Sequence, residues 1–100
     1  FGTTIKESFE MIKEYCIKTG QEEIWKNQPF YHYARIIRNV MSHNFLFDFS
    51  KENKNKFPVK WKSKKIELSM QGLLLFDFFG PIDVFDLLST FNYFVKNTLN

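Results

Sequence analysis

The sequence lacks several features that would define a class of protein. It has one cysteine, Cys16, which excludes a disulfide-stabilised scaffold and is typical of a reducing compartment, so we expect a cytoplasmic protein. No apolar run approaches the roughly 20 residues that cross a bilayer, and no signal peptide opens the chain. We therefore expect no membrane partner. The 100 residues leave room for one hydrophobic core, so we expect one domain over 1–100, incomplete at its N-terminus because it starts at Phe1.

Aromatic residues, in contrast, are abundant. The chain holds 13 Phe, 4 Tyr and 2 Trp, which is 19% of its residues, within an ordinary balance of 44% hydrophobic and 25% charged residues. Because each ring buries a large area, a chain this short can still build a true core or an adhesive interface.

The net charge of +3 is distributed unevenly. Residues 1–50 balance six basic groups against six acidic ones, whereas residues 51–65 hold seven lysines and one glutamate, and residues 66–100 return a balance of −3. Lysines attract phosphates and exposed aromatic rings stack on unpaired bases, so this basic segment is a candidate RNA-binding surface formed by Lys60, Trp61, Lys62, Lys64 and Lys65. The alternative is a solvated loop whose Trp61 packs onto the body of the domain.

Hydrophobic periodicity predicts three main helices. The first helix opens with a capping box at Thr4–Glu7 and stops at Gly20. One face of this helix is apolar and carries Ile5, Phe9, Ile12 and Cys16. A short helical turn follows over 21–28. A second helix has Pro29 in its first turn and ends near Asn44, and its apolar stripe is Phe30, Tyr33, Ala34, Ile37, Val40 and Met41.

The remainder of the chain predicts a hairpin and a last helix. Alternating residues over 57–76 indicate strands with candidate turns at Lys62–Lys65 and Gln71–Gly72, although 73–79 could also open a helix. Asp83 is expected to cap the last helix, which runs to about Leu99. Its apolar positions cover more than half of its circumference, which indicates a central helix or one that also meets a partner: Val84, Phe85, Leu87, Leu88, Phe91, Phe94 and Val95.

One stretch on or just beyond the second helix brings together polar groups that can do chemistry: His32, Arg35, Arg38, Asn39, Ser42, His43 and Asn44. On a straight helix Arg38 and His43 are some 140° and about 7.5 Å apart, so they do not share a face. They can meet on one phosphate only if the helix ends or unwinds at His43, or if a second copy of the chain contributes. Cys16, within the apolar stripe of the first helix, is expected to be a buried and inert thiol.

The run from Arg35 to Asn44 resembles the signature of HEPN domains, in which an arginine, commonly followed by a polar residue, precedes a histidine by four to six positions. Arg38, Asn39 and His43 match it, and the hairpin region with Pro58, Trp61 and Gly72 resembles a branch found in plasmid-encoded bacterial proteins. The resemblance implies a mainly α fold: a HEPN-like antiparallel helical bundle that pairs two-fold, with a small β-hairpin inserted between the second and last long helices. Residues 51–76 would be a basic elaboration on that bundle.

The resemblance also implies a function. Many HEPN proteins are metal-independent endoribonucleases that act as toxins or antiviral effectors, often neutralised by a nucleotidyltransferase-type antitoxin. RNA cleavage without metal or cofactor needs a proton-transfer group, for which histidine is suited, and a fixed cation for the phosphate. We thus expect His43 to be the general acid or base, Arg38 the phosphate clamp and Asn39 an orienting residue, with Arg35 binding RNA. The product would carry a 2′,3′-cyclic phosphate. The alternative is a non-catalytic HEPN-like helical dimer that binds RNA or a partner protein.

Overall fold

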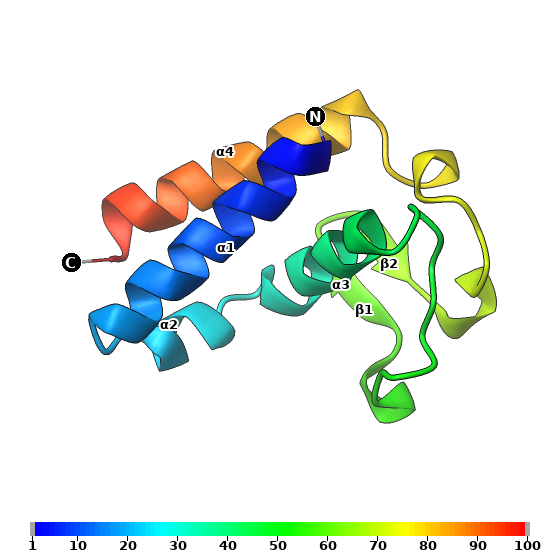
Figure 1. Ribbon diagram of the computed structural model, residues 1–100, viewed down its shortest axis with the longest axis horizontal. Coiled ribbons are helices and arrows are strands. Elements are labelled where there is room, and N and C mark those ends of the chain that lie inside the picture. The colour runs from blue at the N-terminus through cyan, green and yellow to red at the C-terminus, as the bar shows by residue number, and fades with distance from the viewer. Residues whose placement is uncertain (1, 100) are drawn as a thin grey trace.

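Four α-helices and one small hairpin make up the part of the chain described by the computed structural model, which covers the backbone of residues 2–99 and the side chains of residues 5–99. The helices are α1 (Gly2–Lys18), α2 (Glu22–Lys26), α3 (Tyr31–Ser42) and α4 (Pro81–Asn97), and the strands are β1 (Val59–Trp61) and β2 (Lys64–Ile66) (Figure 1). Three 3₁₀ turns complete the order: η1 (Lys54–Lys56), η2 (Leu68–Met70) and η3 (Leu75–Asp77). The prediction of a mainly helical domain with a small hairpin between the second and last long helices is confirmed.

Helix α1 buries the predicted stripe. Its four apolar positions, Ile5, Phe9, Ile12 and Cys16, are all 8% exposed or less. The backbone is already helical at Gly2, so the prediction that Thr4 caps the helix is wrong. The side chain of Thr4 lies outside the side chains that the structure describes. At the other end Gly20 adopts φ +72°, a conformation that favours glycine, and the N–H of Gln21 donates to the carbonyl of Cys16 at 2.7 Å.

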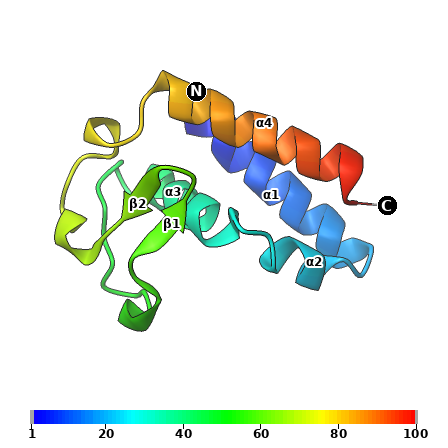
Figure 2. The ribbon, with the colours of Figure 1, turned by 180° about the vertical axis from the view of Figure 1, so that it is seen from behind.

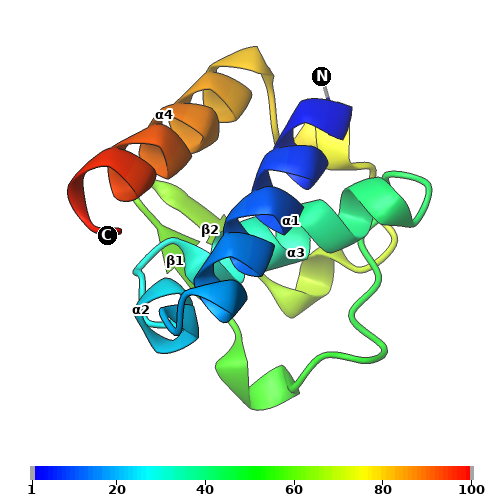
Figure 3. The same cartoon turned by 60° about the vertical axis from the view of Figure 1, so that its left-hand side comes forward.

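Helix α3 is the centre of the fold and lies between α1 and the hairpin (Figures 1 and 3). All six residues of its predicted stripe are buried, and so are Tyr31 and Ile36, because other elements cover α3 on several sides. The helix begins at Tyr31, so the placement of Pro29 in its first turn is wrong; Pro29 lies just before the cap residue Phe30. The helix ends at Ser42, and Asn44 takes the predicted left-handed conformation, as does Phe45.

The rings form a connected core between the helices. Trp25 of α2 is fully buried and lies within 6.1 Å, centroid to centroid, of five other rings, those of Phe9, Phe30, Tyr31, Phe91 and Phe94. These rings come from α1, from α4 and from the start of α3, so the short helix α2 connects all three. Much of the high aromatic content is therefore used for the core.

The hairpin is shorter than predicted. Strands β1 and β2 pair antiparallel with Val59 opposite Ile66, and the turn falls at Lys62 and Ser63, inside the predicted range. Beyond Ile66 the chain forms η2 instead of continuing as a strand. The chain then turns at Gly72, which has φ +82°, and residues 73–75 lie beside the aromatic segment 45–47. Leu46 and Leu74 form an isolated antiparallel β-bridge there. Of the possible helix over 73–79, only the single turn η3 forms.

Helices α1 and α4 lie side by side and run in the same direction (Figures 1 and 2). The segment between α3 and α4 returns the chain to the end where α1 begins, so an antiparallel arrangement does not hold for this pair. Helix α4 starts at Pro81 after the cap residue Gly80, so Asp83 is not the cap; it accepts the N–H of Gly80 at 2.8 Å from inside the first turn. Of its predicted apolar positions, Phe85 and Val95 are exposed at 70% and 43%.

Candidate functional site

Arg38 faces α1. Its Nη1 lies 3.1 Å from Oε1 of Glu10, and its Cζ lies 5.0 Å from the centre of the Phe9 ring. The buried Nε has no hydrogen-bond partner among the residues that the structure describes. The guanidinium is therefore held between an ion pair and an aromatic face, with 23% of the side chain exposed.

His43 is the C-cap residue of α3 and points elsewhere. Its backbone N–H donates to Val40 at 3.0 Å, and its exposed side chain lines a hollow of about 20 Å³, enough for about one water molecule. The other residues of this hollow are Ile36, Asn39, Val40, Leu46, Asp48 and Glu52. Asn39 and His43 are thus brought together, and Arg38 is not among them. The helix does end at His43, yet within one chain Arg38 and His43 still face different surroundings.

Two carboxylates, those of Asp48 and Glu52, line the His43 hollow. Hydrogen bonds from Ser50 and Gln71 lower the pKa of Asp48, and the charge of nearby His43 lowers it further. Hydrogen bonds from Arg35, the charge of Arg35 and a hydrogen bond from Asn39 outweigh burial and lower the pKa of Glu52. No lysine or arginine lines the hollow. A phosphate next to His43 therefore needs a cation from elsewhere.

Arg35 forms the closest ion pair in the neighbourhood. Its two terminal nitrogens donate to the two carboxylate oxygens of Glu52 at 3.1 and 2.8 Å. This bidentate contact connects α3 to the loop before η1, so Arg35, expected to bind RNA, already has an internal partner. Sequence reasoning missed Glu52, although it is the only acid in the basic segment 51–65.

His32 lies on the same side of α3 as this pair. Burial lowers the pKa of His32, and the charges of Lys56 and Arg35 lower it further against the opposing effect of Glu52. Its buried Nδ1 has no hydrogen-bond partner within the described residues. The neutral imidazole is therefore the favoured form in the fold.

The residues expected to form the basic RNA-binding surface divide into two groups. Trp61 is half-buried, and the centre of its ring lies 5.1 Å from that of Tyr33. Trp61 thus packs onto the body of the domain, as expected if the basic segment is a solvated loop. Lys64 donates to the carbonyl of Phe78 at 2.8 Å and lies 3.4 Å from Asp83, so its ammonium is used inside the fold. Lys60, Lys62 and Lys65 are exposed, Lys62 over the Trp61 ring and Lys65 at 3.5 Å from Glu67.

Four further observations concern two single residues and two features of the fold. Cys16 is fully buried, and burial and the charge of Glu22 raise the pKa of its thiol. Ser42 bonds back to the carbonyl of Arg38 at 3.2 Å, as is common within helices. Among the described side chains no group of three or more His, Cys, Asp or Glu residues is arranged to hold a metal ion. Across residues 2–99 we find no helix with the length and apolarity to cross a membrane.

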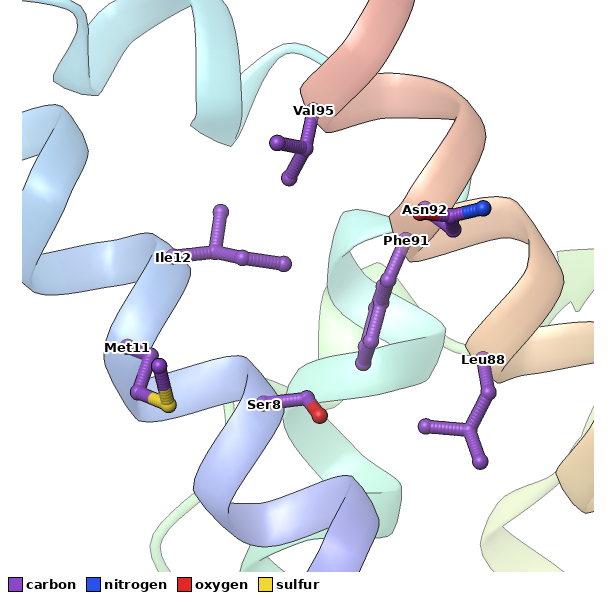
Figure 4. A pocket seen from close by; sticks show the side chains of 7 residues that line it. All are labelled: Ser8, Met11, Ile12, Leu88, Phe91, Asn92 and Val95. Carbon is purple, nitrogen blue, oxygen red and sulfur yellow. The ribbon is translucent and has the colours of Figure 1, made fainter.

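An apolar groove runs between α1 and α4 on the outside of the fold. Figure 4 shows Met11 and Ile12 of α1 and, across a hollow of about 240 Å³, Leu88, Phe91 and Val95 of α4. Met11 is 71% exposed. The sequence predicted more apolar residues on α4 than one buried face can hold. Some of these apolar residues, Leu88, Phe91 and Val95, line this groove.

The fold and the site define a mainly helical domain with an exposed histidine at the end of its central helix. Comparison of the chain with protein-family models, with curated proteins and with solved structures gave no match. The resemblance to HEPN domains therefore stays a prediction from the sequence, based on Arg38, Asn39 and His43 and on the hairpin region.

Proposed function

We propose that this protein is a metal-independent endoribonuclease of the HEPN type. The observation that carries the proposal is the position of His43, which is exposed at the C-terminal end of α3 and shares a hollow with Asn39. In the proposed reaction an imidazole removes the proton of a ribose 2′-hydroxyl, whose oxygen attacks the adjacent phosphorus while the 5′-oxygen leaves with a proton. A guanidinium stabilises the charge that gathers on the phosphate oxygens.

The proposed active site is completed by a second copy of the chain. Within one chain the Arg38 guanidinium faces Glu10, and the described lining of the His43 hollow includes Asp48 and Glu52 but no lysine or arginine. A two-fold dimer that presents Arg38 of one copy to His43 of the other places both groups on one phosphate. The ion pair with Glu10 is no obstacle, since partly exposed pairs of this kind contribute only about 0–1 kcal/mol.

In the cell this activity fits a toxin or an antiviral effector that acts in the cytoplasm. Cleavage of cellular RNA by an uncontrolled enzyme is harmful, so the proposal includes a neutralising protein, of the nucleotidyltransferase type by analogy with HEPN toxins. Its RNA substrate and such an antitoxin are the partners we propose.

The test is cleavage of structured and unstructured RNA in the presence of EDTA. The wild-type protein is expected to yield 2′,3′-cyclic phosphate ends, and Arg38→Ala and His43→Ala are each expected to abolish cleavage. His32→Gln, which alters a second histidine of α3, is the control that keeps activity. If the wild-type protein leaves RNA intact, or if His43→Ala still cuts it, the proposal is wrong.

A mixing experiment tests the shared site. When the inactive Arg38→Ala and His43→Ala proteins are combined, about half of the dimers are mixed, and one of the two sites in each has both groups. Activity should therefore return to about a quarter of the wild-type rate. No recovery, in dimers shown to exchange subunits, would place Arg38 and His43 outside a shared site.

The second candidate is a non-catalytic HEPN-like helical dimer that binds RNA or a partner protein. It is favoured by the internal pairing of Arg38 and by large apolar side chains that stay exposed, notably Met11, Ile82, Phe85 and Tyr93 at 69–77%. Tight RNA binding without cleavage, retained in both the Arg38→Ala and His43→Ala proteins, would identify this second function.

A further inference from the structure

Two neighbouring hollows open on the face formed by residues 49–71, away from the α1–α4 groove. The first, of about 320 Å³, and the second, of about 290 Å³, share Leu68 as a wall. The other lining residues are Phe49, Ser50, Lys54 and Gln71 in the first and Phe57, Pro58, Glu67 and Ser69 in the second. They form one groove with Leu68 as the ridge between its two halves.

The floor of this groove is apolar and held in place. The side-chain oxygen of Gln71 accepts the N–H of Phe49 at 2.6 Å, and Phe49 is buried with its ring 4.8 Å from that of Phe57. Leu68 keeps 38% of its surface exposed. Both halves therefore offer apolar surface, with Leu68 as the exposed part that they share.

The chain around the first half of the groove is rich in lysine, while Glu67 lines the second half. Lys54 lines the first half, and the segment 51–65 has a balance of +6. Two of the nearby acids are compensated, since Glu52 pairs with Arg35 and Glu67 lies 3.5 Å from Lys65; Asp48 stays exposed. Positive charge above an apolar floor is complementary to a chain of phosphates that carries flat bases.

One hydrogen bond links the first half of the groove to the hollow of His43. The amide nitrogen of Gln71 donates to Asp48 at 3.3 Å, and Asp48 lines the hollow that contains His43 and Asn39. Asp48 therefore lies between the first half of the groove and the proposed reacting histidine.

We propose that this groove binds two successive bases of single-stranded RNA, one on each side of Leu68, while Lys54 contacts a phosphate. The inference rests on the proposed ribonuclease function and adds the substrate form that the enzyme selects, which is unpaired RNA. An acidic peptide offers charge without flat rings and is the alternative occupant that the experiment excludes.

The probe is a short 2′-O-methyl oligouridylate, which cannot be cleaved by 2′-hydroxyl attack and so separates binding from catalysis. Its affinity is compared with that of an abasic oligonucleotide of the same length and of polyglutamate. The wild-type protein is expected to prefer the strand with bases by about fivefold or more, because each stacked base strengthens binding severalfold. Leu68→Glu is expected to remove this preference, and thermal unfolding checks that the variant is folded.

Lys54→Gln tests the phosphate contact. It is expected to reduce the slope of log affinity against log salt by about 0.7, the value for one phosphate contact on a single strand. Lys18→Gln, an exposed lysine at the end of α1, is the matched control and should leave the slope unchanged.

The outcomes separate this inference from the proposed function. Preference for bases that is lost in Leu68→Glu supports the groove even if the wild-type protein does not cleave RNA. The groove proposal is wrong if the wild-type protein cleaves RNA and its Leu68→Glu and Lys54→Gln variants bind RNA as Lys18→Gln does. The proposed ribonuclease function would then still hold. Equal affinity for polyglutamate and for the strand with bases would also overturn it.

Discussion

Arg38 of α3 and Glu10 of α1 form an ion pair, with 3.1 Å between Nη1 of Arg38 and Oε1 of Glu10. The pair connects two helices that pack against each other. Both side chains keep part of their surface in solvent, 23% for Arg38 and 44% for Glu10. Solvent and salt screen such a pair, so its contribution to stability is at most about 1 kcal/mol. In the proposed site a phosphate oxygen would displace Glu10 from this guanidinium, and the weakness of the pair makes that displacement inexpensive.

Replacement of Glu10 by Gln is expected to strengthen RNA binding by about three- to fivefold, because removal of a competing carboxylate is worth up to about 1 kcal/mol. Binding of the non-cleavable oligouridylate at constant salt measures the effect. The unfolding free energy should change by less than about 1 kcal/mol.

Glu7→Gln is the matched control for this prediction. Glu7 is exposed on α1, about one turn from Glu10, and its replacement changes the net charge by the same amount. If the two variants bind RNA equally well, the gain reflects overall charge and Arg38 has no part in phosphate binding.

The Arg35–Glu52 pair is expected to stabilise the fold more than the Arg38–Glu10 pair does. Glu52 is only 15% exposed in its side chain and accepts two hydrogen bonds from one guanidinium. Glu52→Gln should therefore lower the unfolding free energy by about 1–2 kcal/mol at neutral pH, as for hydrogen bonds to charged groups. Glu67→Gln, which breaks an exposed pair, should cost less than about 0.5 kcal/mol.

The effect of Glu52 depends on pH in a defined direction. Its pKa in the fold is lowered from 4.5, so its contribution is fully present above pH 4.5 and is lost as the pH falls through the folded value. Denaturant unfolding at neutral pH and below pH 4.5 measures this. A difference between the wild-type protein and Glu52→Gln that persists in strong acid would contradict the assignment.

The helical part of the fold could be predicted from the sequence because its signals are local. The stripe of α1 and the stop at Gly20 depend on residues within a few turns of one another, and the structure confirms both. The exact starts of the helices were less predictable. Asp83 and Pro29 are each typical of a helix start at more than one position, and the backbone uses Gly80 and Phe30 as the caps.

The region 43–80 could not be predicted in the same way because its pairing is not local. Residues 45–47 bond to residues 72–75 across the whole hairpin, and no short-range pattern specifies this contact. The candidate site shows the same limit. The spacing of Arg38 and His43 predicted that they lie on different faces of a helix. The ion-pair partners could not be predicted, because Glu10, which pairs with Arg38, and Glu52, which pairs with Arg35, come from distant segments.

The exposed lysines of the hairpin are expected to act differently from Lys64. Combined replacement of Lys60, Lys62 and Lys65 by Gln should flatten the salt dependence of RNA binding and leave stability nearly unchanged, because all three side chains are exposed. An unchanged slope in this triple variant would show that the hairpin lysines are only solvated.

Lys64→Gln should lower the unfolding free energy by about 1 kcal/mol, since Lys64 donates to the carbonyl of Phe78 and lies 3.4 Å from Asp83. Thermal unfolding measures this cost. Loss of RNA binding from Lys64→Gln without any loss of stability would instead assign its ammonium to the RNA.

His32 is expected to make the fold less stable in mild acid. Burial and the charges of Lys56 and Arg35 lower its pKa below 6.5, so the unfolded chain binds a proton more readily than the folded one. Stability should therefore fall as the pH drops below 6.5 and through the folded value, a window distinct from that of Glu52 below pH 4.5. His32→Gln should flatten the curve of unfolding free energy against pH in the upper window only.

Lys56→Gln should raise the pKa of His32, which NMR titration measures. It should also weaken the pH dependence of stability in the upper window without removing it. A curve for His32→Gln that matches the wild-type curve below pH 6.5 would mean that the fold does not lower the pKa of His32.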